Sequence, residues 1–109
     1  MVDKWLELAQ RNLEVGDSIE KTFTGHCDRK YGYLLMSRKK LLFVSEEGLF
    51  SKKYDLVFSI PYNKLKFDEK GRSGLEVTEV GGKRYDLTFT IERDIVKDGL
   101  QGLMASAHP

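Results

Sequence analysis

The sequence of 109 residues has a single cysteine, only two histidines and no long apolar run. Because Cys27 has no partner, no internal disulfide can form, which fits a reducing compartment. The longest apolar runs, such as residues 41–44, are far too short to span a bilayer. Charged residues near the amino terminus interrupt the apolar stretch that a signal peptide needs. These absences predict a cytoplasmic location, with at most a peripheral contact to a membrane.

No catalytic or metal-binding constellation stands out. The chain has no glycine-rich phosphate loop, no Ser-His-Asp set and no Cys-His pair with an orienting third group. His26 and Cys27 are neighbours that would point to opposite faces of a strand, and the other histidine, His108, lies in the tail, so four zinc ligands cannot converge. The stretch 68–72 lacks the alternating acidic ligands of a calcium loop. We therefore expect no enzymatic activity, no cofactor and no metal.

Composition describes one globular domain without a strong overall charge. The residues are 40% apolar and 32% charged, and the net charge of +1 gives no general attraction to nucleic acid or membrane. The charge is uneven, however: residues 1–28 sum to −3, from six acids against three bases, whereas residues 29–40 hold five bases and no acid. An electrostatic partner must therefore recognise a local patch.

Alternating apolar and polar residues recur between residues 31 and 89 and predict short strands with one face on a core. We expect the alternate apolar residues to face that core: Tyr33, Leu35, Leu42, Val44, Leu56, Phe58, Ile60, Leu75, Val77, Tyr85, Leu87 and Phe89. The predicted strands are a first strand containing Ile19, Phe23 and Cys27, followed by 31–36, 40–45, 54–60, 64–67, 75–80 and 84–90. Pro61 should interrupt the pairing, residues 68–74 should form a loop, and Gly81-Gly82 should make a two-residue hairpin.

A helix is predicted at each end of the chain. The apolar residues Val2, Trp5, Leu6, Ala9 and Leu13 share one helical face over about three turns, ending near Gly16. Its polar face is acidic, which favours packing on its own barrel or on a second copy over lying on a membrane. Residues 92–106 form the second helix, with Val96, Leu100, Leu103 and Met104 on one stripe. We therefore divide the chain into the N-terminal helix, 1–15, and one domain, 16–106.

Several local motifs point to one superfamily. Residues 32–45 comprise a glycine-led strand, a polar turn with basic residues and a strand that contains Leu41-Leu42-Phe43. Ile60-Pro61 then ends a strand before a short segment, Lys64-Leu65-Lys66, and residues 74–77 and 85–89 resemble a last hairpin. These features resemble GRAM domains of the pleckstrin-homology-like superfamily, and bacterial-type pleckstrin-homology domains are comparably similar. The resemblance covers about residues 17–105.

This resemblance implies a mostly β, α+β fold. It would be a seven-stranded antiparallel barrel or sandwich with a C-terminal capping helix, to which this chain adds an extra N-terminal helix. In superfamily members that bind inositol phosphates, basic residues of the first, third and sixth inter-strand loops hold the ligand at the open barrel end. Those loops carry three dibasic pairs here: Arg29 and Lys30, Lys52 and Lys53, and Lys83 and Arg84.

Two interpretations of these pairs stay open. Three converging pairs would cradle a phosphate group, because arginine grips phosphate oxygens bidentately and lysine acts as a point charge. Alternatively, they are ordinary exposed residues at hairpin ends, where lysine and arginine are common. The bases at 38–40 lie at the other end of the second strand, roughly 20 Å away, and cannot join the same small site.

The function that we expect first is a non-catalytic binding module for protein interaction or self-association, through a sheet edge or the end helices. Binding of anionic phospholipid headgroups is the alternative. It ranks second because the phosphoinositide signature of the family has further bases along strand two, and this chain lacks them: it has Tyr-Gly-Tyr-Leu at 31–34. Nucleic acid is not an expected partner, since Tyr33 and Tyr85 are in phase with the core rather than exposed in a basic groove.

Overall fold

The structure, a computed structural model, describes residues 3–89 and 92–107 and has the predicted order of elements. A helix is followed by seven strands and a final helix, and a short 3-10 helix separates the fourth and fifth strands. The elements are α1 (Lys4–Arg11), β1 (Ile19–Cys27), β2 (Lys30–Ser37), β3 (Lys40–Glu47), β4 (Lys53–Pro61), η1 (Tyr62–Lys64), β5 (Leu65–Lys70), β6 (Gly74–Glu79), β7 (Arg84–Thr88) and α2 (Arg93–Ala107). Neither helix is both long and apolar enough to cross a bilayer.

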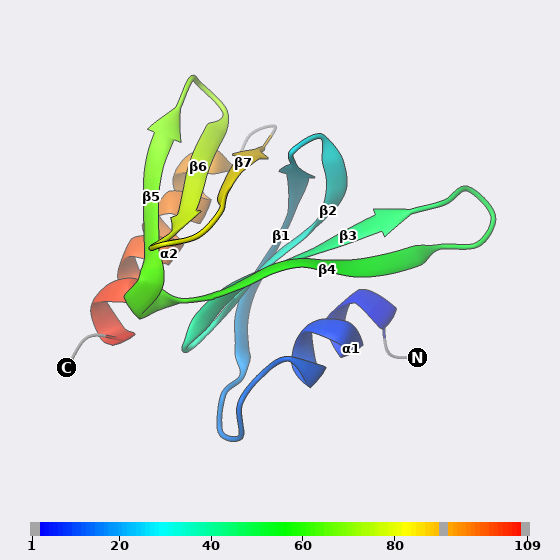
Figure 1. The fold of residues 1–109 in the computed structure, drawn as a ribbon, viewed down its shortest axis with the longest axis horizontal. Helices are drawn as coiled ribbons and strands as arrows, with labels where there is room; N and C mark the ends of the chain where they lie inside the picture. The colour runs from blue at the N-terminus through cyan, green and yellow to red at the C-terminus, as the bar shows by residue number, and fades with distance from the viewer. Residues whose placement is uncertain (1–2, 90–91, 108–109) are drawn as a thin grey trace.

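The seven strands form one antiparallel sheet in the order β4-β3-β2-β1-β7-β6-β5. β1 pairs with β2 along its whole length but meets β7 only through His26 opposite Thr88 and Cys27 opposite Leu87. The sheet therefore curls, and strands β5, β6 and β7 stand across strands β1 to β4 (Figure 1). This arrangement confirms the predicted mostly β, antiparallel fold class with a helix at each end.

Two glycines face each other where β1 and β2 bend, and both are needed for close contacts. Gly25 pairs with Gly32 across the two strands. A Cβ at Gly32 would lie 2.2 Å from the Val44 carbonyl oxygen, and one at Gly25 would lie 2.8 Å from the Phe89 ring. Glycine at both positions lets neighbouring backbone and rings approach closely enough for the sheet to curl.

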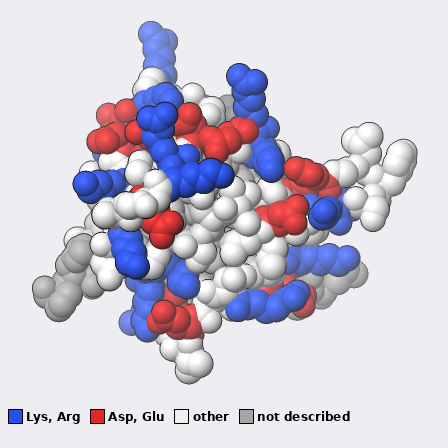
Figure 2. Space-filling view, in the orientation of Figure 1, with Lys and Arg blue, Asp and Glu red and all other residues white. Residues whose placement is uncertain are grey.

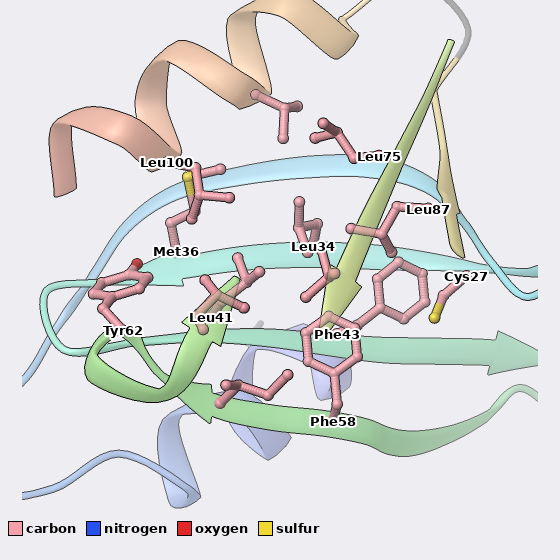
Figure 3. Close-up of a cluster of buried hydrophobic side chains, with 14 of the residues drawn as sticks. Cys27, Leu34, Met36, Leu41, Phe43, Phe58, Tyr62, Leu75, Leu87 and Leu100 are labelled. Atoms are coloured by element: carbon pink, nitrogen blue, oxygen red, sulfur yellow. The ribbon is translucent and has the colours of Figure 1, made fainter. Parts of the chain in front are cut away.

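The barrel interior is apolar and α2 closes one side of it. Val96 and Leu100 are buried and Leu103 and Met104 pack against the same cluster, as the predicted stripe required, whereas Ile95 is exposed. Figure 3 shows Leu100 beside Met36, Leu34 between β2 and the helix, and Phe43 above Phe58. The core thus lies between the concave face of the sheet and α2.

A second apolar layer lies on the outer face of strands β2 to β4, where α1 packs. The predicted direction of one set of side chains was therefore wrong. Tyr33, Leu35, Leu42 and Val44 were expected inside the barrel, but they lie beneath α1, around the buried Ala9. The reason is that β2 and β3 are buried on both faces, so their consecutive apolar residues supply both layers.

A β-bulge separates Leu56 from Phe58, which the alternation placed on one face. The β3–β4 register passes from Phe43 opposite Phe58 to Val44 opposite Leu56, so one extra residue of β4 is accommodated between them. Phe58 joins the barrel core, whereas Leu56 contacts the layer under α1. The bulge reverses the side-chain alternation at that point.

Three predicted boundaries also change. α1 is shorter than expected and ends at Arg11, well before Gly16; Val2 and Thr90 lie outside the described residues. Residues 68–70 belong to β5 rather than to a loop, because their backbones pair with β6 although their side chains are polar and exposed. The β6–β7 hairpin forms at the predicted glycines, but four residues, 80–83, connect its strands, and the Glu79 N–H donates to the Lys83 carbonyl.

Candidate functional site

The β1–β2, β3–β4 and β6–β7 connections are the loops that the resemblance assigns to the open end of the barrel. Asp28 and Arg29 form the β1–β2 turn, and both have positive φ, at 48° and 74°. The Asp28 N–H donates to the Asp86 carbonyl at 2.9 Å, and the Asp86 N–H donates to the Asp28 carboxylate at 3.0 Å. These bonds hold the β1–β2 turn against the start of β7.

Lys30 and Lys83 are two of the predicted bases that the fold brings into one neighbourhood. Lys30 pairs with Cys27 across the β1–β2 hairpin. Burial, together with the carboxylates of Asp28 and Asp86, raises the pKa of the Cys27 thiol to about 12, and the positive charges of Lys30 and Lys83 oppose this rise. The Asp28–Asp86 hydrogen bonds place the turn that precedes Lys30 against the start of the strand that follows Lys83, so both bases belong to the same end of the molecule.

An aromatic ring lies beneath Lys83. The Lys83 ammonium nitrogen lies 5.8 Å from the centre of the Tyr85 ring, within the range of a cation–π interaction. The Tyr85 ring in turn packs 4.8 Å from Phe58, whose neighbour across the sheet is Phe43. Tyr85 is thus a partly buried structural residue, as its phase with the core predicted.

Arg84, Lys52 and Lys53 are not part of this neighbourhood. The Arg84 guanidinium lies 3.8 Å from the Glu76 carboxylate in the neighbouring strand β6. Lys53 pairs with Glu47 at the start of β4, roughly 16 Å from Phe58 at about 3.3 Å per residue. The six bases therefore do not converge on one small cradle: Lys30 and Lys83 lie together, and Lys52 and Lys53 lie on the β3–β4 arm.

Free positive charge nevertheless gathers at this end. Within the part of the chain that the structure describes, Arg29, Lys30, Lys52, Lys53 and Lys83 form no ion pair. Some bases elsewhere are paired with carboxylates, among them Arg38 with Glu20 and Lys97 with Glu69, whereas others, such as Lys64 and Lys66, are also without an ion pair among the described residues. Charges at the open end are therefore available to an external anion.

The β3–β4 hairpin carries an exposed apolar tip that the sequence reasoning missed. Leu49 and Phe50 are 90% and 102% exposed. Gly48, with φ of 105°, begins the loop, and a Cβ there would lie 2.2 Å from the Ser51 carbonyl oxygen. The hairpin projects at the right of Figure 1, and its tip appears in Figure 2 as an uncharged protrusion. The available signal was an apolar pair in a segment where a polar loop is usual.

The histidine and the cysteine of β1 lie apart. Cys27 is fully buried in the core, whereas His26 is exposed and packs edge-on against Tyr31, with ring centres 5.6 Å apart. Among residues 3–89 and 92–107, no group of three or more histidine, cysteine or acidic side chains is placed to hold a metal ion. The binding chemistry available at the open end is thus a combination of free lysine or arginine charge and exposed apolar surface.

Comparisons with solved structures agree with this fold. No protein-family model matches the chain, and no curated protein matches it significantly. The C-terminal domain of an unknown protein from Leishmania infantum is 20% identical, with a TM-score of 0.65 over 91% of this chain and 89% of that one. A DUF1696 family protein with a pleckstrin-homology domain, from Shewanella loihica, is 18% identical, with a TM-score of 0.59 over 98% and 95%.

A pleckstrin-homology domain from Shewanella amazonensis is similar as well. It is 15% identical, with a TM-score of 0.54 over 94% of both chains. At sequence identities this low, the structural similarity supports a shared fold and nothing more specific. The chain therefore has a pleckstrin-homology-like fold, as the sequence resemblance predicted, and these comparisons do not single out the GRAM family.

Proposed function

We propose that this chain is a non-catalytic binding module whose open barrel end contacts anionic membrane surfaces. The observation that carries this proposal is the projecting β3–β4 tip, where Leu49 and Phe50 are exposed and Lys52 and Lys53 follow after one residue. Superfamily membership alone would be an argument by analogy, because one fold hosts many functions. The proposal rests instead on the chemistry of this tip.

Two contributions of moderate size combine at this surface. Full burial of a leucine or phenylalanine side chain is worth about 1.5–3 kcal/mol, and each base near an anionic leaflet adds about 1 kcal/mol. Glu47 and Asp28 lie close by and offset part of the basic charge. Because either contribution alone gives only marginal attachment, we expect reversible binding that requires both the apolar tip and the bases.

The geometry allows both contributions to act together. The β1–β2 turn, with Arg29 and Lys30, and the β3–β4 tip both lie away from the C-terminal end of α2 (Figure 1). A membrane that receives Leu49 and Phe50 would have Lys52 and Lys53 of the same hairpin near its headgroups, and we propose that Arg29 and Lys30 of the β1–β2 turn approach the same surface. Salt should weaken this attraction, because exposed charges are screened over about 8 Å at physiological ionic strength.

Vesicle sedimentation tests the proposal. The protein is mixed with phosphatidylcholine vesicles that contain either no phosphatidylserine or about one third of it. The test variants are Leu49→Ser with Phe50→Ser, and Lys52→Ala with Lys53→Ala. The matched controls are Val15→Ser with Ile95→Ser, which removes exposed apolar side chains elsewhere, and Lys64→Ala with Lys66→Ala, which removes exposed bases elsewhere.

We expect binding only to the anionic vesicles, a loss of at least fivefold in each test variant, and no change in the controls. Equal binding by the tip variant, or no binding at low salt, would contradict the proposal. If the tip variant instead abolishes a concentration-dependent increase in mass without any effect on vesicles, the tip serves protein association.

Protein interaction, the function ranked first from the sequence, is the second candidate. The two outer strands of the sheet give little support to strand addition, because β4 carries a bulge and ends at Pro61, and β5 exposes Lys66, Asp68 and Lys70. Both end helices pack on the sheet of their own chain. The specific support for a protein partner is a groove between α1 and the start of β1.

A further inference from the structure

A groove of about 670 Å³ lies between α1 and the first half of β1. Its apolar lining comes from Trp5, Leu6 and Leu13 on the helical side and from Ile19 on the strand. Each of these side chains is only partly buried, and Val15 at the groove margin is fully exposed. The groove therefore offers apolar contact surface that the chain itself leaves incompletely covered.

The margin of this groove is acidic. Glu14, Asp17 and Glu20 line it, against the single base Lys21. The Asp17 carboxylate is fully engaged, since it accepts hydrogen bonds from the Ser18 N–H, the Ser37 hydroxyl and the Arg38 N–H. Glu14 and Glu20 are different, because they make only long, exposed pairs, at 3.5 Å with Lys39 and 3.9 Å with Arg38.

Such exposed pairs exchange partners at little cost, so two carboxylates are available to an incoming cation. The uneven charge along the sequence thus has a structural counterpart: part of the acidic N-terminal segment borders an apolar groove. A peptide with lysine or arginine beside apolar side chains would match both the lining and the margin.

We infer that the groove between α1 and β1 binds a segment of a protein partner in which apolar residues alternate with lysine or arginine. This inference rests on the second candidate function, protein interaction, and does not depend on membrane contact. β1 runs from Ile19 at the groove to Cys27 at the open end, roughly 26 Å at about 3.3 Å per residue. A partner in the groove and a membrane at the open end would occupy separate sites.

The position of the only tryptophan provides a readout. Trp5 lines the groove and stacks on Tyr33, so its fluorescence should change when a peptide covers it. The probe is a seven-residue peptide of alternating lysine and leucine, with blocked ends, and its matched control replaces each lysine with glutamate. Binding is followed by Trp5 fluorescence and by amide chemical shifts of the full chain.

The variant that tests the margin is Glu14→Lys with Glu20→Lys. Its control is Asp68→Lys with Asp98→Lys, which changes the net charge equally at exposed positions outside the groove lining. A third variant, Val15→Ser, alters the apolar margin at a fully exposed side chain, so the fold should be preserved.

We expect the lysine peptide to shift amides of residues 13–22 and to bind at least tenfold more weakly to the margin variant, but less than threefold more weakly to its control. Val15→Ser should weaken binding two- to fivefold. Equal binding of the glutamate peptide, shifts confined to other surfaces, or no shift at 1 mM peptide would overturn the inference. So would a dimer of the chain alone that Glu14→Lys with Glu20→Lys dissociates, because the occupant would then be a second copy. The same variants are also tested for vesicle binding. Because the groove and the open end are separate sites, a failure of peptide binding and a failure of membrane binding can be told apart.

Discussion

The indole ring of Trp5 stacks on the phenol ring of Tyr33, with ring centres 4.1 Å apart and planes within 8° of parallel. The contact joins α1 to β2 and covers one end of the apolar layer formed by Leu35, Leu42 and Val44. An isolated helix of eight residues is not stable in water, so α1 depends on this packing. The stacked pair therefore anchors the N-terminal segment to the domain.

Replacing the stacked indole should destabilise the whole domain. We expect Trp5→Ala to lower the free energy of unfolding by about 2–3 kcal/mol, because it removes a large, partly buried aromatic ring and its stacking contact with Tyr33. Urea unfolding followed by circular dichroism measures the change. Lys4→Ala, at an exposed position of the same helix, should change stability by less than about 0.5 kcal/mol. Equal effects of the two substitutions would show that α1 does not pack on the sheet.

Two glycines should respond to alanine in opposite directions. Gly32→Ala should cost about 3 kcal/mol or more, because its Cβ would press on the Val44 carbonyl oxygen and the Phe43 ring. Gly102→Ala should raise the free energy of unfolding by about 0.5–1 kcal/mol, because α2 has open space there and alanine is the better helix former. Thermal unfolding of both variants checks the pair. A neutral Gly32→Ala would contradict the close approach of β2 and β3.

Alkaline pH should destabilise the fold through buried phenol and thiol groups. Burial raises the pKa of Cys27 and of Tyr33 to about 12, and burial also raises the pKa of Tyr62. These groups hold their protons longer in the folded chain than in the unfolded one, whose ordinary values are 9.0 for the thiol and 10.0 for the phenol. Their contribution to stability is therefore complete below pH 9 and falls as pH rises toward 12.

Urea midpoints between pH 8 and 11.5 measure this loss. Tyr62→Phe should flatten part of the slope above pH 10 and should also cost about 1 kcal/mol at neutral pH, because the Tyr62 hydroxyl donates to the Ser37 carbonyl at 2.6 Å. A slope that is the same in Tyr62→Phe and in the original chain would contradict this account of the buried phenol.

Arg29 should show opposite effects on stability and on membrane binding. It occupies the second position of the two-residue β1–β2 turn at φ of 74°, where glycine is normally favoured. We expect Arg29→Gly to raise stability by about 1 kcal/mol and to weaken binding to anionic vesicles several-fold. Arg72→Gly, in the β5–β6 turn, should neither raise stability nor weaken binding to the vesicles. Unchanged vesicle binding by Arg29→Gly would remove this base from the proposed contact surface.

The strands could be predicted because side-chain alternation and turn residues fix local structure. The faces of β2 and β3 could not be assigned, since Leu34 and Leu35 are both fully buried and alternation does not say which layer lies inside. Residues 68–70 are polar and exposed, so only their pairing with β6 reveals a strand. The sequence identified the dibasic pairs, but only the fold shows that Arg84 pairs with Glu76 whereas Lys30 and Lys83 share one neighbourhood.

Insertion of the β3–β4 tip is tested most directly by moving the fluorescent side chain onto it. In the variant Trp5→Phe with Phe50→Trp, the only tryptophan stands at an exposed position of the tip. Anionic vesicles should shift its emission to the blue, and brominated acyl chains should quench it. An unshifted, unquenched emission, in the presence of vesicles that sediment the protein, would contradict insertion of Leu49 and Phe50 into the membrane.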